Sequence, residues 1–152
     1  MEIRKRMKNY SLQYSKNNSS DKDIRNHLER CDELFKPFLS SYINLEEYSK
    51  KLLERAVRYE IFDNANLVGL VAVYHSSNIG YISNFSLEQQ FLGKDLSSQL
   101  MKLCIDDSKK QKLITIRLEV FKENLRAIKF YFKHGFTIES DNAKVLIFIK
   151  TL

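Results

Sequence analysis

The chain has 152 residues, of which 43% are hydrophobic and 12% aromatic, with only four glycines and one proline. This length is sufficient to bury a hydrophobic core in one domain, and the composition excludes a disordered or loop-rich chain. The formal net charge of +6 predicts an anionic partner, either a phosphorylated small molecule or a nucleic acid, although the basic residues are spread out and part of the excess is solvated surface.

The beginning of the chain, "MEIRKRMKNY", is charged and lacks the apolar run of a signal peptide. No stretch approaches 18 consecutive apolar residues, so we expect no membrane span and a cytoplasmic location. Cys31 and Cys104 are far apart, and together with three scattered histidines they match no zinc spacing. We therefore expect buried thiols in a reducing compartment and no metal site.

The first expected elements are a strand and a helix. Residues 9–15 alternate apolar and polar side chains, which is typical of a strand. Ser20 and Asp23 have the spacing of a capping box and predict a helix start. An apolar stripe at helical spacing then runs through residues 24–35, and Pro37 marks its end.

A second cap, Asn44 with Glu47, predicts a helix over residues 45–56. His27 lies on the apolar stripe of the preceding helix, so we interpret it as a core or boundary residue whose hydrogen bonds are satisfied within the protein.

After residue 56 the hydrophobic period changes from 3.6 to 2. The patterns predict strands at 57–63, 67–75, 79–87, 113–121, 136–140 and 144–152, and helices at 96–110 and within 121–136. The order βααβββαβαββ predicts an α+β fold with a mixed sheet, in one domain spanning residues 1–152.

Two stretches carry a resemblance to a known family. They are "SLEQQFLGKDLSSQLM" at 86–101 and "LEVFKENLRAIKFYFKHGF" at 118–136. With the element order, they resemble the GCN5-related N-acetyltransferase (GNAT) superfamily over about residues 57–150. The resemblance implies a mostly antiparallel central sheet flanked by helices. It also implies acetyl-CoA as cosubstrate, and direct transfer of its acetyl group to a primary amine of a small molecule or protein.

The second stretch contains Asn124, Tyr131 two helical turns later, and Gly135. Asn124 can cap the helix, and Gly135 suits the left-handed residue that ends it. The resemblance implies that Asn124 contacts the cofactor and that Tyr131 supplies a proton to the leaving thiolate. A phenol near pKa 10 is a weaker acid than a thiol near 8.5, so this role requires a dry pocket that raises the pKa of the thiol. The alternative is that Tyr131 only packs against the sheet.

For the first stretch, the resemblance implies that the backbone N–H of Leu87 binds the thioester carbonyl, stabilising the oxyanion. It also implies that the following turn and helix start hold the pyrophosphate, through Leu92, Gly93, Lys94, Asp95, Leu96, Ser97 and Ser98. The family usually has Arg or Gln, then Gly, then Gly or Ala at the positions of Leu92, Asp95 and Ser97. These departures put cofactor affinity in question more than the fold.

Asp95 has two open geometries. Its carboxylate can face the phosphates, where it would weaken binding, or it can cap the helix at 96–110 by accepting the N–H of Ser97 or Ser98. An aspartate just before an apolar periodic run is a common helix start, which favours the cap.

The acceptor amine must lose a proton before it attacks. Glu60, His75 and Glu119 lie on predicted strands and are candidate bases, and a water relay would need none of them. Arg117 lies two residues from Glu119 on the same strand face, which predicts an ion pair between them. We assign no general base.

The acceptor also stays open among an amino sugar, a polyamine, an antibiotic and a protein amine. The resemblance implies that the helices at 24–35 and 45–56 form a wall of the acceptor site. Two other functions stay open: a non-catalytic GNAT-fold protein that binds a ligand or partner, favoured by Leu92 and Asp95, and a basic interaction or nucleic-acid module, supported by charge alone. A homodimer is equally open.

Overall fold

A computed structural model describes residues 3–7 and 10–152. The strands are β1 (Ile3–Met7), β2 (Tyr10–Lys16), β3 (Val57–Asp63), β4 (Asn66–Ser76), β5 (Ile79–Leu87), β6 (Thr115–Phe121), β7 (Thr137–Asp141) and β8 (Val145–Thr151). The helices are α1 (Asp21–Cys31), α2 (Leu45–Arg55), α3 (Leu96–Lys110) and α4 (Leu125–Lys133), with short 3₁₀ turns η1 (Asp32–Leu34), η2 (Leu39–Ser41) and η3 (Gln89–Phe91).

The strands form an 8-stranded sheet in the order β1-β2-β3-β4-β5-β6-β8-β7. All neighbouring strands are antiparallel except β5 and β6, which are parallel. This confirms the α+β class and the mixed, mostly antiparallel sheet. The predicted order lacked β1, because its charged sequence shows no apolar alternation and it forms by backbone pairing with β2 at the sheet edge. Residue 9 of the first predicted strand lies outside the described residues.

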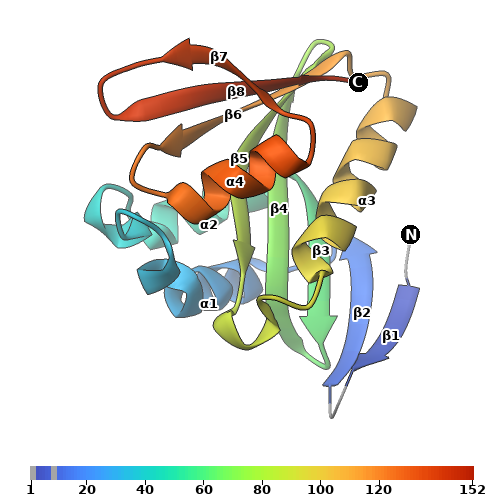
Figure 1. Ribbon diagram of the computed structural model, residues 1–152. Coiled ribbons are helices and arrows are strands. Elements are labelled where there is room, and N and C mark those ends of the chain that lie inside the picture. The colour runs from blue at the N-terminus through green and yellow to red at the C-terminus, as the bar shows by residue number, and fades with distance from the viewer. Residues whose placement is uncertain (1–2, 8–9) are drawn as a thin grey trace.

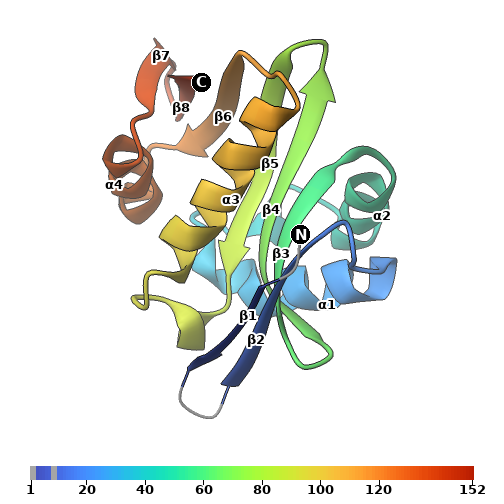
Figure 2. The same ribbon diagram turned by 90° about the vertical axis from the view of Figure 1, so that its right-hand side faces the viewer.

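The sheet separates two layers of helices. Figures 1 and 2 show α1 and α2 against one face and α3 and α4 against the other. Each face has its own hydrophobic cluster: Ile24, Leu28 and Leu52 pack on one side, whereas Leu96 and Leu100 pack on the other. A polar side chain on either face of β5 can therefore be reached only by the helices that cover that face.

The helix starts confirm the capping predictions. In α1 the Ser20 hydroxyl accepts the N–H of Asp23 at 3.1 Å, and the Asp23 carboxylate accepts the N–H of Ser20 at 2.9 Å. In α2 the Asn44 side chain accepts the N–H of Glu47 at 3.0 Å. These contacts satisfy backbone donors that have no partner within the helix.

The first helix is shorter than the predicted range of 24–35. It ends at Cys31 and continues as η1, whose Asp32 carboxylate accepts the backbone N–H of Ser40 at 2.7 Å. Leu34 and Phe35 continue the apolar spacing past the end of the helix, but they belong to the connection and line a cavity. Helical periodicity therefore overstated the length of this helix.

Strands β5 and β6 separate halfway along their length. They pair only from Ile79 with Thr115 to Ile82 with Leu118. Beyond that point residues 84–87 of β5 pair with β4, and residues 119–121 of β6 pair with β8. The gap that opens between the two parallel strands positions the candidate site.

Candidate functional site

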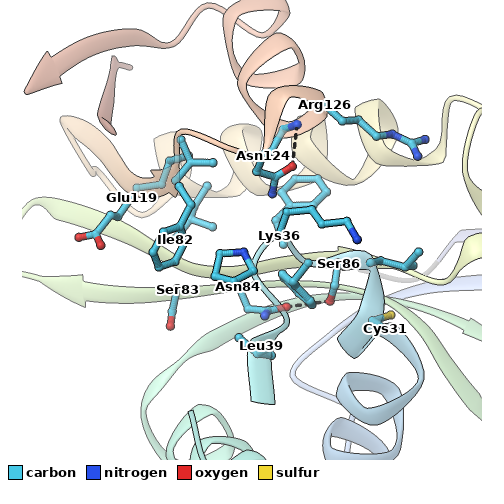
Figure 3. A pocket seen from close by; sticks show the side chains of 18 of the residues that line it. Cys31, Lys36, Leu39, Ile82, Ser83, Asn84, Ser86, Glu119, Asn124 and Arg126 are labelled. Atoms are coloured by element: carbon cyan, nitrogen blue, oxygen red, sulfur yellow. Dashed lines mark hydrogen bonds between the residues drawn. The ribbon is translucent and has the colours of Figure 1, made fainter. Parts of the chain in front are cut away.

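Two adjoining cavities occupy the opening between β5 and β6. Their volumes are about 430 Å³ and about 480 Å³. Both are lined by Phe85, Ser86, Leu87, Leu92, Asn124, Arg126, Ala127 and Tyr131, so they form one continuous depression that crosses the open end of the sheet. Figure 3 shows Glu119 and Arg126 on opposite sides of the first cavity, with Asn84 and Ser86 between them and Asn124 above. We call the first the acceptor-side cavity and the second the helix-side cavity.

Leu87 presents its backbone to the opening. It pairs with Gly69 of β4, and the next residue, Glu88, donates its N–H to the Val68 carbonyl at 2.9 Å. Because alternate residues of a strand direct their N–H groups to opposite sides, the N–H of Leu87 points away from β4 and toward the gap. Gly69 makes room for this register, since a Cβ there would lie 2.9 Å from the Leu87 side chain.

Tyr131 lies on the buried face of α4 and lines both cavities. Its ring packs edge-on against Phe136, at 5.5 Å between centroids, and at a tilt against Phe148, at 5.9 Å. Burial raises the pKa of the Tyr131 phenol, and Cys104 raises it further. The hydroxyl makes no hydrogen bond with another described residue, so it is a protonated donor available to a group in the cavity.

Asn124 and Gly135 close the two ends of α4 as predicted. The Asn124 side chain accepts the N–H of Ala127 at 3.3 Å, which leaves its amide NH₂ group for the cavities that it lines. Gly135 has a φ of +84°, the left-handed conformation that lets the chain leave the helix. The Phe136 N–H then bonds the Tyr131 carbonyl at 3.0 Å.

The turn before α3 carries two left-handed residues, Gly93 with a φ of +76° and Asp95 with a φ of +63°. The predicted cap by Asp95 is wrong: its side chain makes no capping hydrogen bond. The physical reason is that a capping side chain requires an extended backbone, and a left-handed one directs the carboxylate elsewhere. Asp95 instead lines the helix-side cavity with Ser97 and Ser98. The N–H groups of the first turn of α3 therefore have no side-chain cap among the described residues.

The remaining residues predicted to hold the cofactor divide into two groups. Leu87, Leu92, Gly93, Asp95, Ser97, Ser98 and Asn124 line the helix-side cavity. Leu96 is fully buried in the core, so only its backbone is available to a ligand, and Lys94 is not among the lining residues.

Two cations in the helix-side cavity were not predicted. Arg126 and Lys133 both line it from α4. They are seven residues apart, two helical turns, and this spacing on one helix face was the signal in the sequence. His134 also joins the two helices, since its Nε2 lies 3.0 Å from the Ser98 hydroxyl at the start of α3.

On the side of α1 and α2, the acceptor-side cavity is walled mainly by the connection between these two helices. Its lining includes Leu34, Phe35, Lys36, Pro37, Leu39, Tyr42 and Ile43 from that connection, with only Cys31 from α1 and Tyr48 from α2. Tyr48 is fixed by its hydroxyl, which donates to the Ser83 carbonyl at 2.9 Å. The predicted helical wall is thus largely a loop wall, lined with aromatic and aliphatic side chains.

The three candidate bases have different surroundings. Glu60 is fully buried and accepts hydrogen bonds from Ser15, Asn18 and Ser19, outside both cavities. His75 is exposed and lines neither cavity. Only Glu119 lines the acceptor-side cavity. Its predicted ion pair is wrong, because Arg117 bonds Glu139 instead.

The residues interpreted as core lie in the core. Both cysteines are free and buried, and burial raises the pKa of the Cys31 thiol to about 12. His27 is fully buried with hydrogen bonds at both ring nitrogens.

Among the helices of the described residues, none combines the length and the apolar character that crossing a bilayer requires.

A model of the acetyltransferase (GNAT) family matches residues 22–136. In sequence, the chain is 26% identical over 123 residues to spermidine N(1)-acetyltransferase of Thermoplasma acidophilum, covering 74% of this chain and 76% of that protein. The family match runs from α1 to Phe136 and includes every element that lines the two cavities.

Solved structures share the fold. A Pyrococcus horikoshii protein has a TM-score of 0.79 at 22% identity, covering 93% of this chain and 98% of that one. The PaiA N-acetyltransferase of Thermoplasma acidophilum, crystallised with coenzyme A, has a TM-score of 0.74 at 19% identity, covering 91% and 99%. At these identities the likeness concerns the fold.

Proposed function

We propose, since this chain belongs to the acetyltransferase (GNAT) family, that it is an N-acetyltransferase that moves the acetyl group of acetyl-CoA to a primary amine by direct attack. One observation carries the proposal. The N–H of Leu87, the hydroxyl of Tyr131 and the uncapped start of α3 all open into one continuous depression. They are an oxyanion donor, a thiolate donor and an anion site in a single row.

The helix-side cavity suits the phosphates of coenzyme A. The first turn of α3 offers backbone N–H groups and the positive end of the helix dipole. Arg126 and Lys133 add two cations. Space is also available, because a Cβ built on Gly93 would meet no atom within 4 Å. Asp95 is the opposing feature, since it places a carboxylate in the same cavity.

Leu87 would act at the carbonyl of the thioester. As an amine attacks, negative charge develops on the carbonyl oxygen, and a backbone N–H that already points at it lowers the barrier without reorganising. The direction of this N–H is already fixed before the reaction, because pairing of β5 with β4 holds the Leu87 backbone in place.

Tyr131 would act at the sulfur. Its raised pKa means that it keeps its proton at neutral pH and can donate a hydrogen bond to the leaving thiolate. Complete proton transfer to sulfur requires that the same apolar surroundings also raise the pKa of the thiol. In either case the donor stabilises charge that appears only as the C–S bond breaks.

The acceptor amine would enter the acceptor-side cavity, where Glu119 supplies a carboxylate and Tyr42 and Tyr81 supply aromatic faces. Carboxylates and aromatic faces both attract alkylammonium groups. Because one of the similar proteins is named for spermidine, a polyamine is the first acceptor to test.

The deciding experiment has two measurements on the same protein. Calorimetric titration with acetyl-CoA and CoA tests the helix-side cavity, and CoA release from acetyl-CoA with spermidine, an amino sugar and a peptide α-amine tests transfer. Binding with transfer to at least one amine supports the enzyme. Binding without transfer to any amine would favour the non-catalytic ligand-binding protein, for which Asp95 in the cofactor cavity is the specific observation.

A further inference from the structure

A line of buried polar groups leads from the acceptor-side cavity into the protein. Asn84 and Ser86 of β5 line the cavity, although only 4% and 5% of their surfaces are exposed. The Ser86 hydroxyl donates to the Asn84 amide oxygen at 2.7 Å, and the same Ser86 oxygen lies 2.8 Å from Nε2 of His27. His27 is on α1, with no exposed surface, so the cavity reaches it only through its neighbours, which are the Ser86 hydroxyl and the Cys31 thiol. Figure 3 shows the Asn84–Ser86 bond at the cavity floor.

The other ring nitrogen of His27 faces two oxygen acceptors. Its Nδ1 lies 3.1 Å from the Leu67 carbonyl and 3.6 Å from a carboxylate oxygen of Glu88. Arg30 is the remaining charged group of this cluster, and its Nε lies 3.1 Å from the same Glu88 oxygen. The Cys31 sulfur is 3.7 Å from Nε2 and 3.8 Å from Nδ1. Because the two oxygens beside Nδ1 can only accept, whereas the Ser86 hydroxyl beside Nε2 can also donate, Nδ1 carries the proton when the ring is neutral.

This arrangement is satisfied in two protonation states. In neutral His27, Nε2 is the acceptor, and the Ser86 hydroxyl turns from the Asn84 oxygen to donate to it. The Asn84 amide then rotates and donates its NH₂ group to the Ser86 oxygen. In protonated His27, Nε2 donates to the Ser86 oxygen, and the hydroxyl turns to the Asn84 oxygen. Ser86 can thus pass a proton inward by accepting one and donating another, and a rotation of the Asn84 amide keeps every group paired.

The groups around His27 act on its pKa in opposite directions. Burial lowers the pKa of His27, Glu88 raises it and Arg30 lowers it, with burial as the largest cause. The ring is therefore neutral at pH 7 with Nε2 unprotonated. After it gains a proton, the Glu88 carboxylate stabilises the imidazolium, as in the His–carboxylate pairs of general bases.

We propose that His27 receives, through the Ser86 hydroxyl, the proton that the acceptor ammonium must lose before it attacks. This inference rests on the proposed acetyl transfer. The N–H bond of the ammonium breaks and its proton goes to the Ser86 oxygen, while the Ser86 proton moves to Nε2 of His27. The free amine then attacks the thioester carbonyl beside Leu87, the residue that follows Ser86. The imidazolium later returns its proton to solvent by the same route.

The test compares the pH dependence of three variants. His27→Gln keeps a donor and an acceptor but cannot take up a proton, and Ser86→Ala removes the connection. Ser15→Ala is the control, because it deletes another strand hydroxyl that is 2% exposed and bonded to Glu60 at 3.1 Å, away from both cavities. Each is assayed with spermidine from pH 6.5 to 9.5, or with the acceptor that the amine panel identifies. Acetyl-CoA affinity is measured in parallel.

We expect kcat/KM of His27→Gln and Ser86→Ala to be about 10²-fold below wild type at pH 7, with acetyl-CoA affinity retained. Without a base, only the unprotonated amine reacts, so the deficit should shrink about tenfold per pH unit and vanish near pH 9. Ser15→Ala should follow the wild-type profile.

Other outcomes would overturn the relay. A deficit that is equal at every pH means that His27 and Ser86 are structural only, with acetyl transfer itself intact. A wild-type protein that acetylates no amine refutes the proposed function and the relay together. If His27→Gln does not fold, Ser86→Ala carries the same comparison, because its smaller change leaves His27 in place.

Discussion

The Arg117 guanidinium forms two hydrogen bonds with the Glu139 carboxylate, at 2.8 Å and 3.0 Å, and so joins β6 to β7 across β8. This pair decides the surroundings of Glu119. With Arg117 engaged elsewhere, Glu119 forms no ion pair with another described residue and lines the acceptor-side cavity. Burial raises the pKa values of both Tyr42 and Tyr81, and the charge of Glu119 raises them further.

Glu119→Gln should weaken the binding of a polycationic acceptor. An exposed carboxylate contributes little per contact, so we expect KM for spermidine to rise about 2- to 5-fold with kcat nearly unchanged, and the effect to fade at high salt. Initial-rate kinetics at two salt concentrations measure this. Glu123→Gln is the matched control, an exposed carboxylate outside both cavities. An equal KM for wild type and Glu119→Gln would remove Glu119 from acceptor binding.

Tyr131→Phe should separate chemistry from binding. The ring contacts with Phe136 and Phe148 persist, so the fold should be retained. We expect kcat to fall about 10²-fold, with acetyl-CoA affinity within about twofold of wild type. Because the Tyr131 pKa is raised, no titration of this phenol should appear in the rate between pH 6 and 9. Unchanged single-turnover rates would exclude the hydroxyl from the reaction.

Asp95→Gly should improve both the turn and the cavity. Glycine accepts a φ of +63° without the steric cost of a side chain, and the change removes a carboxylate from the helix-side cavity. We expect acetyl-CoA to bind up to about tenfold tighter at low salt, with less gain at high salt. Asp95→Asn removes only the charge. Asp95→Ala removes the carboxylate but keeps a Cβ at this left-handed φ, and it should be about 1 kcal/mol less stable than Asp95→Gly in urea unfolding. Unaltered affinity in both Gly and Asn variants would show that the carboxylate does not act on the phosphates.

Coenzyme A should stabilise the protein through its phosphates. A ligand at 100 times its Kd adds about 2.7 kcal/mol to the free energy of unfolding, and pantetheine, without the phosphates, should add much less. Arg126→Gln and Lys133→Gln should reduce the thermal shift by CoA and leave that by pantetheine unchanged, because both cations line the helix-side cavity. Lys129→Gln, on the same helix but outside the lining, is the control. Equal protection by CoA and pantetheine would contradict a phosphate site at α3.

Stability should fall as the pH drops below neutral. Burial lowers the pKa of His27 in the folded state below its ordinary value of 6.5. At pH values between the folded-state pKa and 6.5, the unfolded chain therefore binds more protons than the folded one, and the free energy of unfolding rises with pH. His75 and His134, less buried, are shifted in the same direction. Urea unfolding at pH 7.5 and 5.5 should therefore show a smaller loss in His27→Gln than in wild type. The same loss in both proteins would mean that the pKa of His27 is the same in the folded and unfolded states, so that burial does not lower it.

Local patterns determined most of the elements. The change of hydrophobic period from 3.6 to 2 after residue 56, and the side chains of Ser20, Asn44 and Asn124, predicted helices and strands that the structure contains. These signals are readable because period and capping depend on residues within one or two turns. The same locality explains the errors: Asp95 has the composition of a cap, but its left-handed backbone, imposed by the turn it closes, prevents capping.

The site depended on contacts that no local pattern reports. Arg117 contacts Glu139 rather than Glu119, because β8 pairs with both β6 and β7 and brings these two strands into one sheet. His27 contacts Ser86, 59 residues away, because α1 packs on the face of β5 that carries the Ser86 side chain. The sequence placed His27 on a buried stripe, which depends only on helical period. Its hydrogen-bond partners were decided by tertiary packing, since pairing a buried polar group requires whichever donor or acceptor the opposite element presents.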